Sequence, residues 1–310
     1  MKVALLGPNG FVGQNVINEF TKNGMDFFPV SRKFGYDLRK KSDNIRFIKD
    51  SQCSVILNCA AHVGSLNYVT KNAADIVSDN GQMILSLYDG VREINPEILI
   101  INPIANCAFP ANASIFKEEN VWDGPLHPSI LSYGLTRRFL IGIAECYKMQ
   151  SGIRTINLYT PNMYGPFDST DPDKAHALNA LVSKFVKAGK NNNAELEVWG
   201  SGNVIREWLY VKDFSRIVSM IISSTDNYNL CKPLNIAQNW GLSIKELVNL
   251  ITKSFDYHGQ VNWNKSMPDG ALKKIMDDTE FRKHFSDFRF TTLEEGIQET
   301  TNYYLSKFPY

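Results

Sequence analysis

The stretch Val3-Ala4-Leu5-Leu6-Gly7-Pro8-Asn9-Gly10-Phe11-Val12-Gly13 decides the fold of this chain. Its four leading apolar residues predict a buried strand, and the apolar spacing that begins at Phe11 predicts a helix as far as Phe20. The glycines between them permit a tight turn whose backbone N–H groups can approach a pyrophosphate, an anion that the helix N-terminus also favours. We therefore predict a dinucleotide-binding turn, the alternative being a turn with only a structural role. Its cofactor-binding residues are Gly7, Asn9, Gly10, Phe11, Val12 and Gly13.

The rest of the first half alternates short apolar runs with longer segments of helical spacing. Further strands are predicted at 27–30, 55–60, 98–101 and 155–158, and long helices at 75–91 and 130–149. Strands that are apolar throughout and separated by helices are typical of a parallel sheet covered on both faces. Such a sheet binds ligands beyond the carboxyl ends of its strands.

The second half is mixed, with helices predicted at 175–187, 211–222, 243–254 and 293–305 and short strands at 196–199, 206–210 and 261–263. The predicted fold class is α/β, a Rossmann-type doubly wound parallel sheet with a smaller mixed C-terminal substrate lobe. We assign 1–165 and about 204–237 to the dinucleotide-binding domain, and about 166–203 and 238–310 to the second lobe.

Composition excludes several classes of protein. With 33 basic and 32 acidic residues the formal charge is +1, so we expect no nucleic-acid or membrane surface. No apolar run is long enough to span a bilayer, and the first residues lack a signal-peptide pattern, so we expect a cytoplasmic location. The cysteines are odd in number and scattered, which predicts free thiols and no metal site. They are Cys53, Cys59, Cys107, Cys146 and Cys231.

The end of the second strand indicates which nicotinamide nucleotide is bound. A carboxylate there would bind the ribose hydroxyls of NAD, whereas a cation accommodates the extra phosphate of NADP. The chain has Ser31, Arg32 and Lys33 at this point and no acidic residue before Asp37. NADP(H) is therefore favoured over NAD(H), with Ser31 and Arg32 as cofactor-binding residues; the alternative is a solvated basic loop.

A tyrosine with a basic residue four positions later on one helix face forms a proton-transfer pair, because the cation stabilises the phenolate. About 1.4 such pairs are expected by chance from 13 tyrosines and 33 basic residues, so position decides between those present. The five are Tyr36/Lys40, Tyr88/Arg92, Tyr133/Arg137, Tyr228/Lys232 and Tyr303/Lys307. Only Tyr133 lies on the helix that follows the 98–101 strand, so we assign Tyr133 and Arg137 as catalytic, the alternative being a packing tyrosine.

Further motifs follow in order along the chain. They are Ala60-Ala61-His62-Val63-Gly64, Asn106-Cys107-Ala108-Phe109-Pro110, Pro161-Asn162-Met163-Tyr164-Gly165-Pro166, Trp199-Gly200-Ser201-Gly202, Arg206-Glu207-Trp208-Leu209, and Pro268-Asp269-Gly270 with Lys273-Lys274. Together with the spacing of the glycine turn, they resemble the GDP-L-fucose synthase family of extended short-chain dehydrogenases/reductases over essentially the whole chain. That family epimerises and then reduces a 4-keto-6-deoxy GDP-sugar.

The resemblance implies roles for individual residues. Cys107 and His176 correspond to the acid/base pair for epimerisation, which a thiol and an imidazole can perform because both titrate within reach of neutral pH. Without the resemblance, a buried thiol and a helix-face histidine are the simpler readings. Further cofactor-binding residues are Ala60, Ala61, Asn80 and Asn162. Substrate-binding residues are Asn106, Asn162, Lys184, Trp199, Ser201, Arg206 and Lys273, with Lys274 a further candidate for the diphosphate. The resemblance also implies a homodimer formed through the helices at 75–91 and 130–149.

Three departures from the family pattern bear on the chemistry. The catalytic serine is Ala105, the YxxxK lysine is Arg137, and the lysine of the AAKVGG segment is His62. Arginine keeps the charge beside the phenol but cannot release a proton. Three functions therefore stay open: an NADPH-dependent epimerase/reductase, a nucleotide-sugar epimerase, isomerase or dehydratase without net reduction, and a binding protein without turnover.

Overall fold

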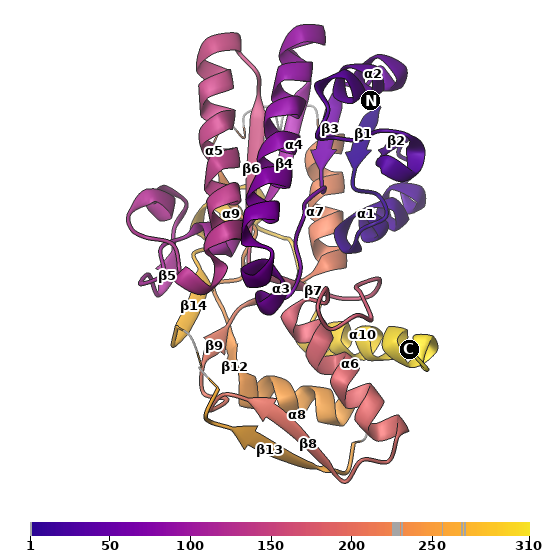
Figure 1. Ribbon diagram of the computed structural model, residues 1–310, viewed down its shortest axis with the longest axis vertical. Coiled ribbons are helices and arrows are strands. Elements are labelled where there is room, and N and C mark those ends of the chain that lie inside the picture. The colour runs from indigo at the N-terminus through magenta and orange to yellow at the C-terminus, as the bar shows by residue number, and fades with distance from the viewer. Residues whose placement is uncertain (1, 225–229, 231, 256, 268, 270) are drawn as a thin grey trace.

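The computed structural model describes residues 2–224, 230, 232–255, 257–267, 269 and 271–310. Tyr228, Cys231, Pro268 and Gly270 lie outside the described residues. The centre of the larger domain is a six-stranded parallel sheet in the order β11-β6-β4-β3-β1-β2 (Figure 1). Its strands are β1 (Val3–Leu6), β2 (Phe27–Val30), β3 (Val55–Asn58), β4 (Leu99–Ala105), β6 (Thr155–Thr160) and β11 (Leu234–Asn235). The predicted doubly wound sheet is confirmed.

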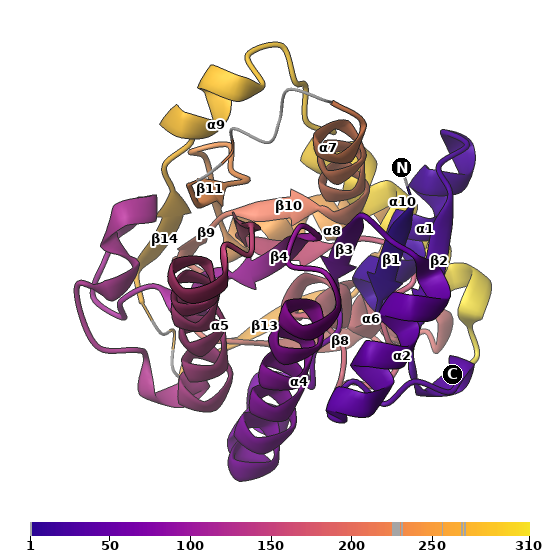
Figure 2. The same cartoon turned by 90° about the horizontal axis from the view of Figure 1, so that it is seen from above.

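Helices cover both faces of this sheet (Figure 2). One face carries α2 (Lys41–Ser51), α4 (Ala73–Ile94) and α5 (Leu131–Ser151), and the other carries α1 (Phe11–Lys22) and α7 (Val211–Ser223). Alternate residues of β1 face opposite sides, so Ala4 and Leu6 join the first core whereas Val3 and Leu5 join the second. All four are buried, which is why the strand is apolar throughout.

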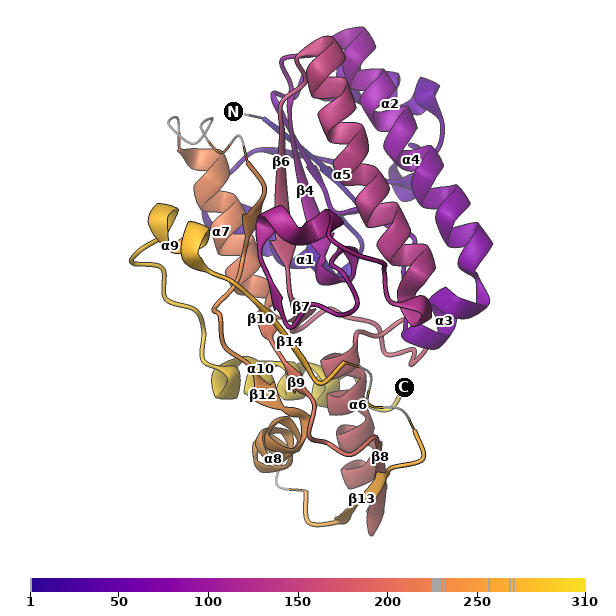
Figure 3. The same cartoon turned by 90° about the vertical axis from the view of Figure 1, so that its left-hand side faces the viewer.

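A third core lies in the smaller lobe, where α6 (Ala177–Lys190), α8 (Ile244–Phe255) and α10 (Leu293–Lys307) pack with the parallel pair β8 (Glu195–Trp199) and β13 (Gln260–Asn264). A mixed sheet in the order β12-β9-β14-β5 pairs strands of this lobe with a strand from the first half of the chain. Its strands are β5 (Ile115–Phe116), β9 (Ile205–Arg206), β12 (Leu242–Ser243) and β14 (Lys273–Met276). A parallel pair, β7 (Asn162–Tyr164) and β10 (Trp208–Tyr210), lies between the two lobes (Figure 3).

The strand predicted at 206–210 is wrong as a single element. It is two strands in different sheets, β9 and β10, separated by Glu207. The Glu207 side chain is buried and accepts hydrogen bonds from the backbone N–H groups of Gln238 and Met276. Those bonds redirect the chain from one sheet to the next.

Several short elements were not predicted, since few residues in each are periodic. They are α3 (Leu66–Lys71), α9 (Thr279–His284), and the 3-10 turns η1 (Arg32–Phe34), η2 (Asn106–Ala108), η3 (Glu118–Trp122) and η4 (Pro128–Ile130), together with α2, β5, β7, β11, β12 and β14. Among the described residues, no helix combines the length and the apolar character that crossing a membrane requires. The four described cysteines are free thiols, as predicted.

Candidate active site

The glycine turn is packed too tightly for side chains at two positions. Gly7 has φ of +75°, and a Cβ there would lie 2.9 Å from the backbone nitrogen of Ala60, at the end of β3. A Cβ on Gly13 would lie 2.2 Å from the carbonyl oxygen of Gly7. Gly10 caps α1 without a side-chain hydrogen bond, and the first turn of α1 contains no acidic residue. The turn is therefore a cradle of backbone N–H groups that fits a phosphate.

The end of β2 lies beside this turn. The Asn9 side-chain amide donates a hydrogen bond to the Ser31 hydroxyl at 3.0 Å, which joins the glycine turn to the end of β2. Arg32 follows and is exposed. Asp37, the first acidic residue after β2, is engaged by Arg39 at 2.8 Å, and these hydrogen bonds lower the pKa of Asp37 to about 2. The Asp37 carboxylate is thus already paired with Arg39 and is not free to bind the ribose hydroxyls of NAD. This end of β2 therefore fits NADP better than NAD.

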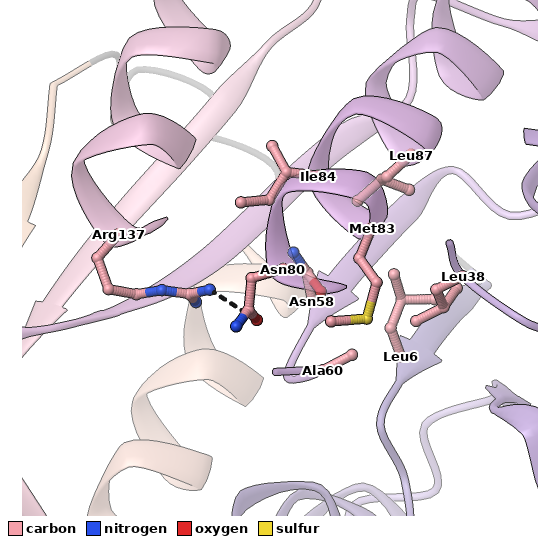
Figure 4. Close-up of a pocket in the computed structure, with 9 residues that line it drawn as sticks. All are labelled: Leu6, Leu38, Asn58, Ala60, Asn80, Met83, Ile84, Leu87 and Arg137. Carbon is pink, nitrogen blue, oxygen red and sulfur yellow. Dashed lines mark hydrogen bonds between the residues drawn. The ribbon is translucent and has the colours of Figure 1, made fainter. Parts of the chain in front are cut away.

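Arg137 is buried and lies over the phenol ring that the sequence singled out. Its guanidinium carbon is 4.8 Å from the centre of the Tyr133 ring, and its Nη2 donates to Asn80 Oδ1 at 3.3 Å (Figure 4). Its Nε is buried and has no hydrogen-bond partner among the described residues. A buried unpaired donor is costly, so this N–H fits a ligand oxygen such as a ribose hydroxyl.

Cys107 lies against the same helix, because β4 ends at Ala105 and passes directly into η2. A Cβ on Gly134 of α5 would lie 2.7 Å from the Cys107 carbonyl oxygen. Burial raises the pKa of the Cys107 thiol to about 11 despite the nearby charges of Arg137 and Lys274. Burial also raises the pKa of Tyr133, an effect that Arg137 opposes and Cys107 reinforces. Thiol and phenol are thus brought together, both in their protonated forms at neutral pH.

His176 precedes α6 and meets the glycine turn from the second lobe. Its ring centre lies 5.0 Å from that of Phe11, and its Nδ1 is 3.1 Å from Asp168 Oδ1. Burial by itself would raise the pKa of Asp168, but hydrogen bonds from His176 and Asn179 hold it below the usual value. An ionised carboxylate only accepts, so His176 Nδ1 carries the hydrogen of this bond. Sequence reasoning missed Asp168, because nothing in its spacing from His176 marks it.

Two cations of the mixed sheet lie next to one another. Parallel pairing of β9 with β14 places Arg206 opposite Lys274. Burial lowers the pKa of both side chains, and Lys274 also interacts with Cys107. Arg206 Nη2 donates to the Asp269 carbonyl at 3.3 Å, while the Asp269 carboxylate accepts from the Ser201 backbone at 2.7 Å. These contacts join Ser201 and Asp269 to Arg206, which lies opposite Lys274, the cation near Cys107.

Three further residues that we predict to bind the substrate have exposed side chains. Lys184 is exposed, and its Nζ donates to the Glu197 carbonyl at 2.5 Å. Trp199 is also exposed, with its indole nitrogen on the Glu197 carboxylate at 3.0 Å. Lys273 is exposed beside Lys274, because alternate residues of a strand face opposite sides. Asn106 is part of η2, next to Cys107, and Asn162 begins β7.

The tyrosines of the other predicted pairs that the structure describes make hydrogen bonds outside the Tyr133–Cys107 site. Tyr88 is fully buried and its hydroxyl contacts Thr155, and Tyr36 donates to Asp50. Tyr303 lies on α10, where its hydroxyl donates to the Asp168 carbonyl at 3.3 Å. Among the residues that the structure describes, no group of three or more His, Cys, Asp or Glu is arranged to hold a metal ion.

Residues 3–237, which contain the glycine turn, Tyr133 and Cys107, match the family model described as NAD dependent epimerase/dehydratase family. The chain belongs to this family. Within the NAD-dependent epimerases/dehydratases it is similar to a probable GDP-L-fucose synthase 1 from Oryza sativa subsp. japonica, with 28% identity over 305 residues, 98% of this chain and 92% of the relative.

Solved structures share the fold at lower identity. A GDP-L-fucose synthetase from Naegleria fowleri superposes with a TM-score of 0.87 at 22% identity, covering 99% of this chain and 94% of that one, and it has also been solved bound to NADP. A GDP-6-OMe-4-keto-L-xylo-heptose reductase from C. jejuni gives a TM-score of 0.86 at 21% identity, with 99% and 98% covered. The chain thus shares its fold with these solved structures over nearly its whole length.

Proposed function

We propose that this chain is an NADP(H)-dependent epimerase/reductase acting on a 4-keto GDP-sugar. The observation that carries the proposal is the meeting of Tyr133, Arg137 and Cys107 at the carboxyl end of β4, the same edge of the parallel sheet at which the glycine turn follows β1. Its curated relatives, which include a GDP-L-fucose synthase and a GDP-L-colitose synthase, support the substrate class. The residues of the site give each step a candidate group.

NADPH fits the dinucleotide site, and when bound it supplies the hydride. The backbone between Gly10 and Gly13 would hold the pyrophosphate, and Ser31 with Arg32 would hold the 2′-phosphate. The Arg137 Nε, which has no partner among the described residues, would donate to the nicotinamide ribose. Ala60 and Ala61 after β3, Asn80 on α4 and Asn162 at the start of β7 are the remaining residues that we propose to contact the cofactor.

Tyr133 protonates the C4 oxygen during reduction. Its raised pKa keeps the phenol protonated, which suits a proton donor, and Arg137 stabilises the phenolate left behind. Arg137 itself cannot pass on a proton, so the phenol regains its hydrogen from water or from another side chain.

Cys107 and His176 perform the epimerisation with distinct roles. His176, whose Nδ1–H donates to Asp168, removes a proton from a carbon beside the ketone through Nε2. Cys107, whose pKa is raised to about 11, is protonated and returns a proton to the opposite face. In the second lobe, Arg206 and Lys274 bind the diphosphate, with Ser201 and the loop at Asp269 beside them.

The direct test incubates the protein with NADPH and several 4-keto GDP-sugars in deuterated water. We expect one NADPH oxidised per sugar, and deuterium incorporated at carbons flanking C4. If both ligands bind but neither NADPH oxidation nor deuterium incorporation occurs, the protein is a binding protein without turnover.

A second function is favoured by one specific observation. Ala105 supplies no hydroxyl at the end of β4, and Arg137 releases no proton, so hydride transfer lacks two groups that the family pattern contains. Under this alternative the protein is a nucleotide-sugar epimerase, isomerase or dehydratase. Deuterium would then enter the sugar without net oxidation of NADPH.

We further propose that the protein is a homodimer. Leu131, Leu135 and Phe139 recur every four residues on α5 and are 53%, 46% and 37% exposed. Val77 and Leu85 of α4, the neighbouring helix, are also exposed (Figure 1). Exposed apolar side chains on two neighbouring long helices fit the same helices of a second copy. We also propose that residues 1–165 and about 204–237 form the dinucleotide-binding domain, and that about 166–203 and 238–310 form the second lobe.

A further inference from the structure

The ring of His62 lies between a carboxylate and a phenol. Its Nδ1 is 2.9 Å from Asp79 Oδ2, and its Nε2 is 2.9 Å from the Tyr68 hydroxyl. Asp79 is fixed on its other side by Arg39 at 3.1 Å, and Arg39 also pairs with Asp37. The groups facing the imidazole are therefore Asp79 from α4 and Tyr68 from α3, with the Arg39–Asp37 pair behind Asp79.

The charges fix the direction of these hydrogen bonds. Because a carboxylate only accepts, the bond to Asp79 places a hydrogen on His62 Nδ1, which leaves Nε2 to accept from the Tyr68 hydroxyl. Carboxylate, imidazole and hydroxyl thus form a chain in which the imidazole can take the hydroxyl proton and become a cation beside Asp79. This is the arrangement that activates a hydroxyl group in acid/base catalysis.

The phenol lies where the two lobes meet. A Cβ on Gly64 would lie 2.6 Å from the Tyr68 ring, and the Ser65 N–H donates to the Asp173 carbonyl at 2.8 Å, three residues before His176. On the other side, the Ser132 hydroxyl donates to the Val69 carbonyl at 2.9 Å. The residues next to Tyr68 and next to Tyr133 are therefore hydrogen-bonded, and α3 lies at the foot of α4 and α5, above the second lobe (Figure 3).

The same histidine is tied to the reductive pair. The Asn80 side chain accepts from the His62 N–H at 3.0 Å and donates to the His62 carbonyl at 2.9 Å. Its Oδ1 also accepts from Arg137, which lies over Tyr133. Asn80 thus joins the His62 backbone to the buried cation and fixes the position of His62 relative to Arg137 and Tyr133.

We propose that Tyr68 is a further general base of the sugar site, activated by His62 and Asp79; the proposal rests on the proposed function. The phenol oxygen takes a proton from a carbon of the sugar beside the ketone, while the phenol hydrogen passes to His62 Nε2. The electron pair of the broken C–H bond moves into the enolate, and the imidazolium is balanced by Asp79. Together with His176, the site then has one base for each carbon that flanks the ketone.

The test uses the full-length protein with NADPH and a 4-keto GDP-sugar in deuterated water. Tyr68→Phe keeps the ring against Gly64 and removes only the hydroxyl. We expect it to lower deuterium incorporation at one flanking carbon by at least ~100-fold, with incorporation at the other carbon and the sugar KM nearly unchanged. His62→Gln, which cannot titrate, produces the same selective loss. Tyr147→Phe is the matched control, since it removes a tyrosine hydroxyl bound to Asp89 outside the site.

Normal incorporation at both carbons in Tyr68→Phe overturns the proposal, as does an equal loss at both carbons, which indicates a structural role. If the wild-type protein has no turnover, the proposed function fails and the inference is decided by ¹⁵N NMR of the His62 ring. Adding GDP-mannose should then shift Nε2 in the wild-type protein and leave it unmoved in Tyr68→Phe. No shift in the wild-type protein places Tyr68 outside the sugar site and refutes the inference.

Discussion

The Arg137 guanidinium carbon lies 4.8 Å from the centre of the Tyr133 ring, one helical turn along α5. The cation lies on the face of the ring, where it stabilises negative charge on the phenol without accepting its proton. Tyr133→Phe should therefore lower NADPH-dependent reduction by roughly 10²-fold or more. Stopped-flow measurement of NADPH oxidation checks this, with NADPH affinity and the free energy of unfolding nearly unchanged. Unchanged reduction would show that Tyr133 is not the proton donor.

The Asp168–His176 pair predicts a separate effect on epimerisation. Asp168→Asn permits the imidazole to bind its neighbour through the other tautomer, which removes the lone pair from Nε2. Deuterium incorporation should fall by at least ~100-fold, whereas direct reduction of the unepimerised ketone continues. Mass spectrometry of the product sugar measures both. Equal losses of incorporation and reduction would mean that Asp168 only maintains the fold.

The glycine turn provides a matched pair of substitutions. A Cβ on Gly13 would meet the Gly7 carbonyl oxygen at 2.2 Å, whereas a Cβ on Gly81, within α4, has no atom within 4 Å. Gly13→Ala should destabilise the protein by about 1–3 kcal/mol and weaken NADPH binding at least ~10-fold. Gly81→Ala should stabilise it by about 0.5–1 kcal/mol, since alanine is the better helix former. Urea denaturation and NADPH titration compare the two variants, and similar results for both would contradict the packing argument.

Glu207 predicts a pH-dependent stability. Burial raises the pKa of its carboxyl to about 7, from 4.5, despite the backbone hydrogen bonds that it accepts. Between these values the folded state binds more protons than the unfolded state, so the free energy of unfolding decreases as the pH rises from about 4.5 to 7. The decrease is on the order of 3 kcal/mol.

Glu207→Gln should remove that part of the pH dependence, although it also loses one acceptor at every pH. The readout is therefore the difference in slope between the two proteins in urea denaturation at several pH values. Parallel slopes would show that Glu207 ionises normally in the folded protein.

The exposed stripe on α5 predicts the oligomeric state. Leu135→Asp places a charge in the centre of the stripe and should convert a dimer into monomers, because a desolvated unpaired charge is costly. Met149→Asp, 86% exposed at the end of the same helix, should leave the dimer intact. Light scattering coupled to size-exclusion chromatography measures both. A wild-type monomer would contradict the proposed dimer directly.

Local spacing was sufficient for much of the fold. The glycine turn, the apolar strands and the long helices were predicted within a few residues, because periodicity and turn chemistry depend on neighbours in the chain. Local spacing also predicted that Tyr133 lies on the helix after β4. Strand order and connection direction in such a sheet leave few alternative positions for that helix. The strand at 206–210 was wrong because a buried Glu207, bonded to residues far along the chain, divides it.

The sequence by itself determined that this chain forms a doubly wound sheet with a glycine turn between its first strand and first helix, because those features follow from contacts between near neighbours. Tertiary structure alone decided which distant side chains meet: Asp168 on His176, Lys274 rather than Lys273 opposite Arg206, and His62 between Asp79 and Tyr68. Strand register and helix packing determine those side-chain contacts, and neither can be read from the sequence spacing of the residues concerned.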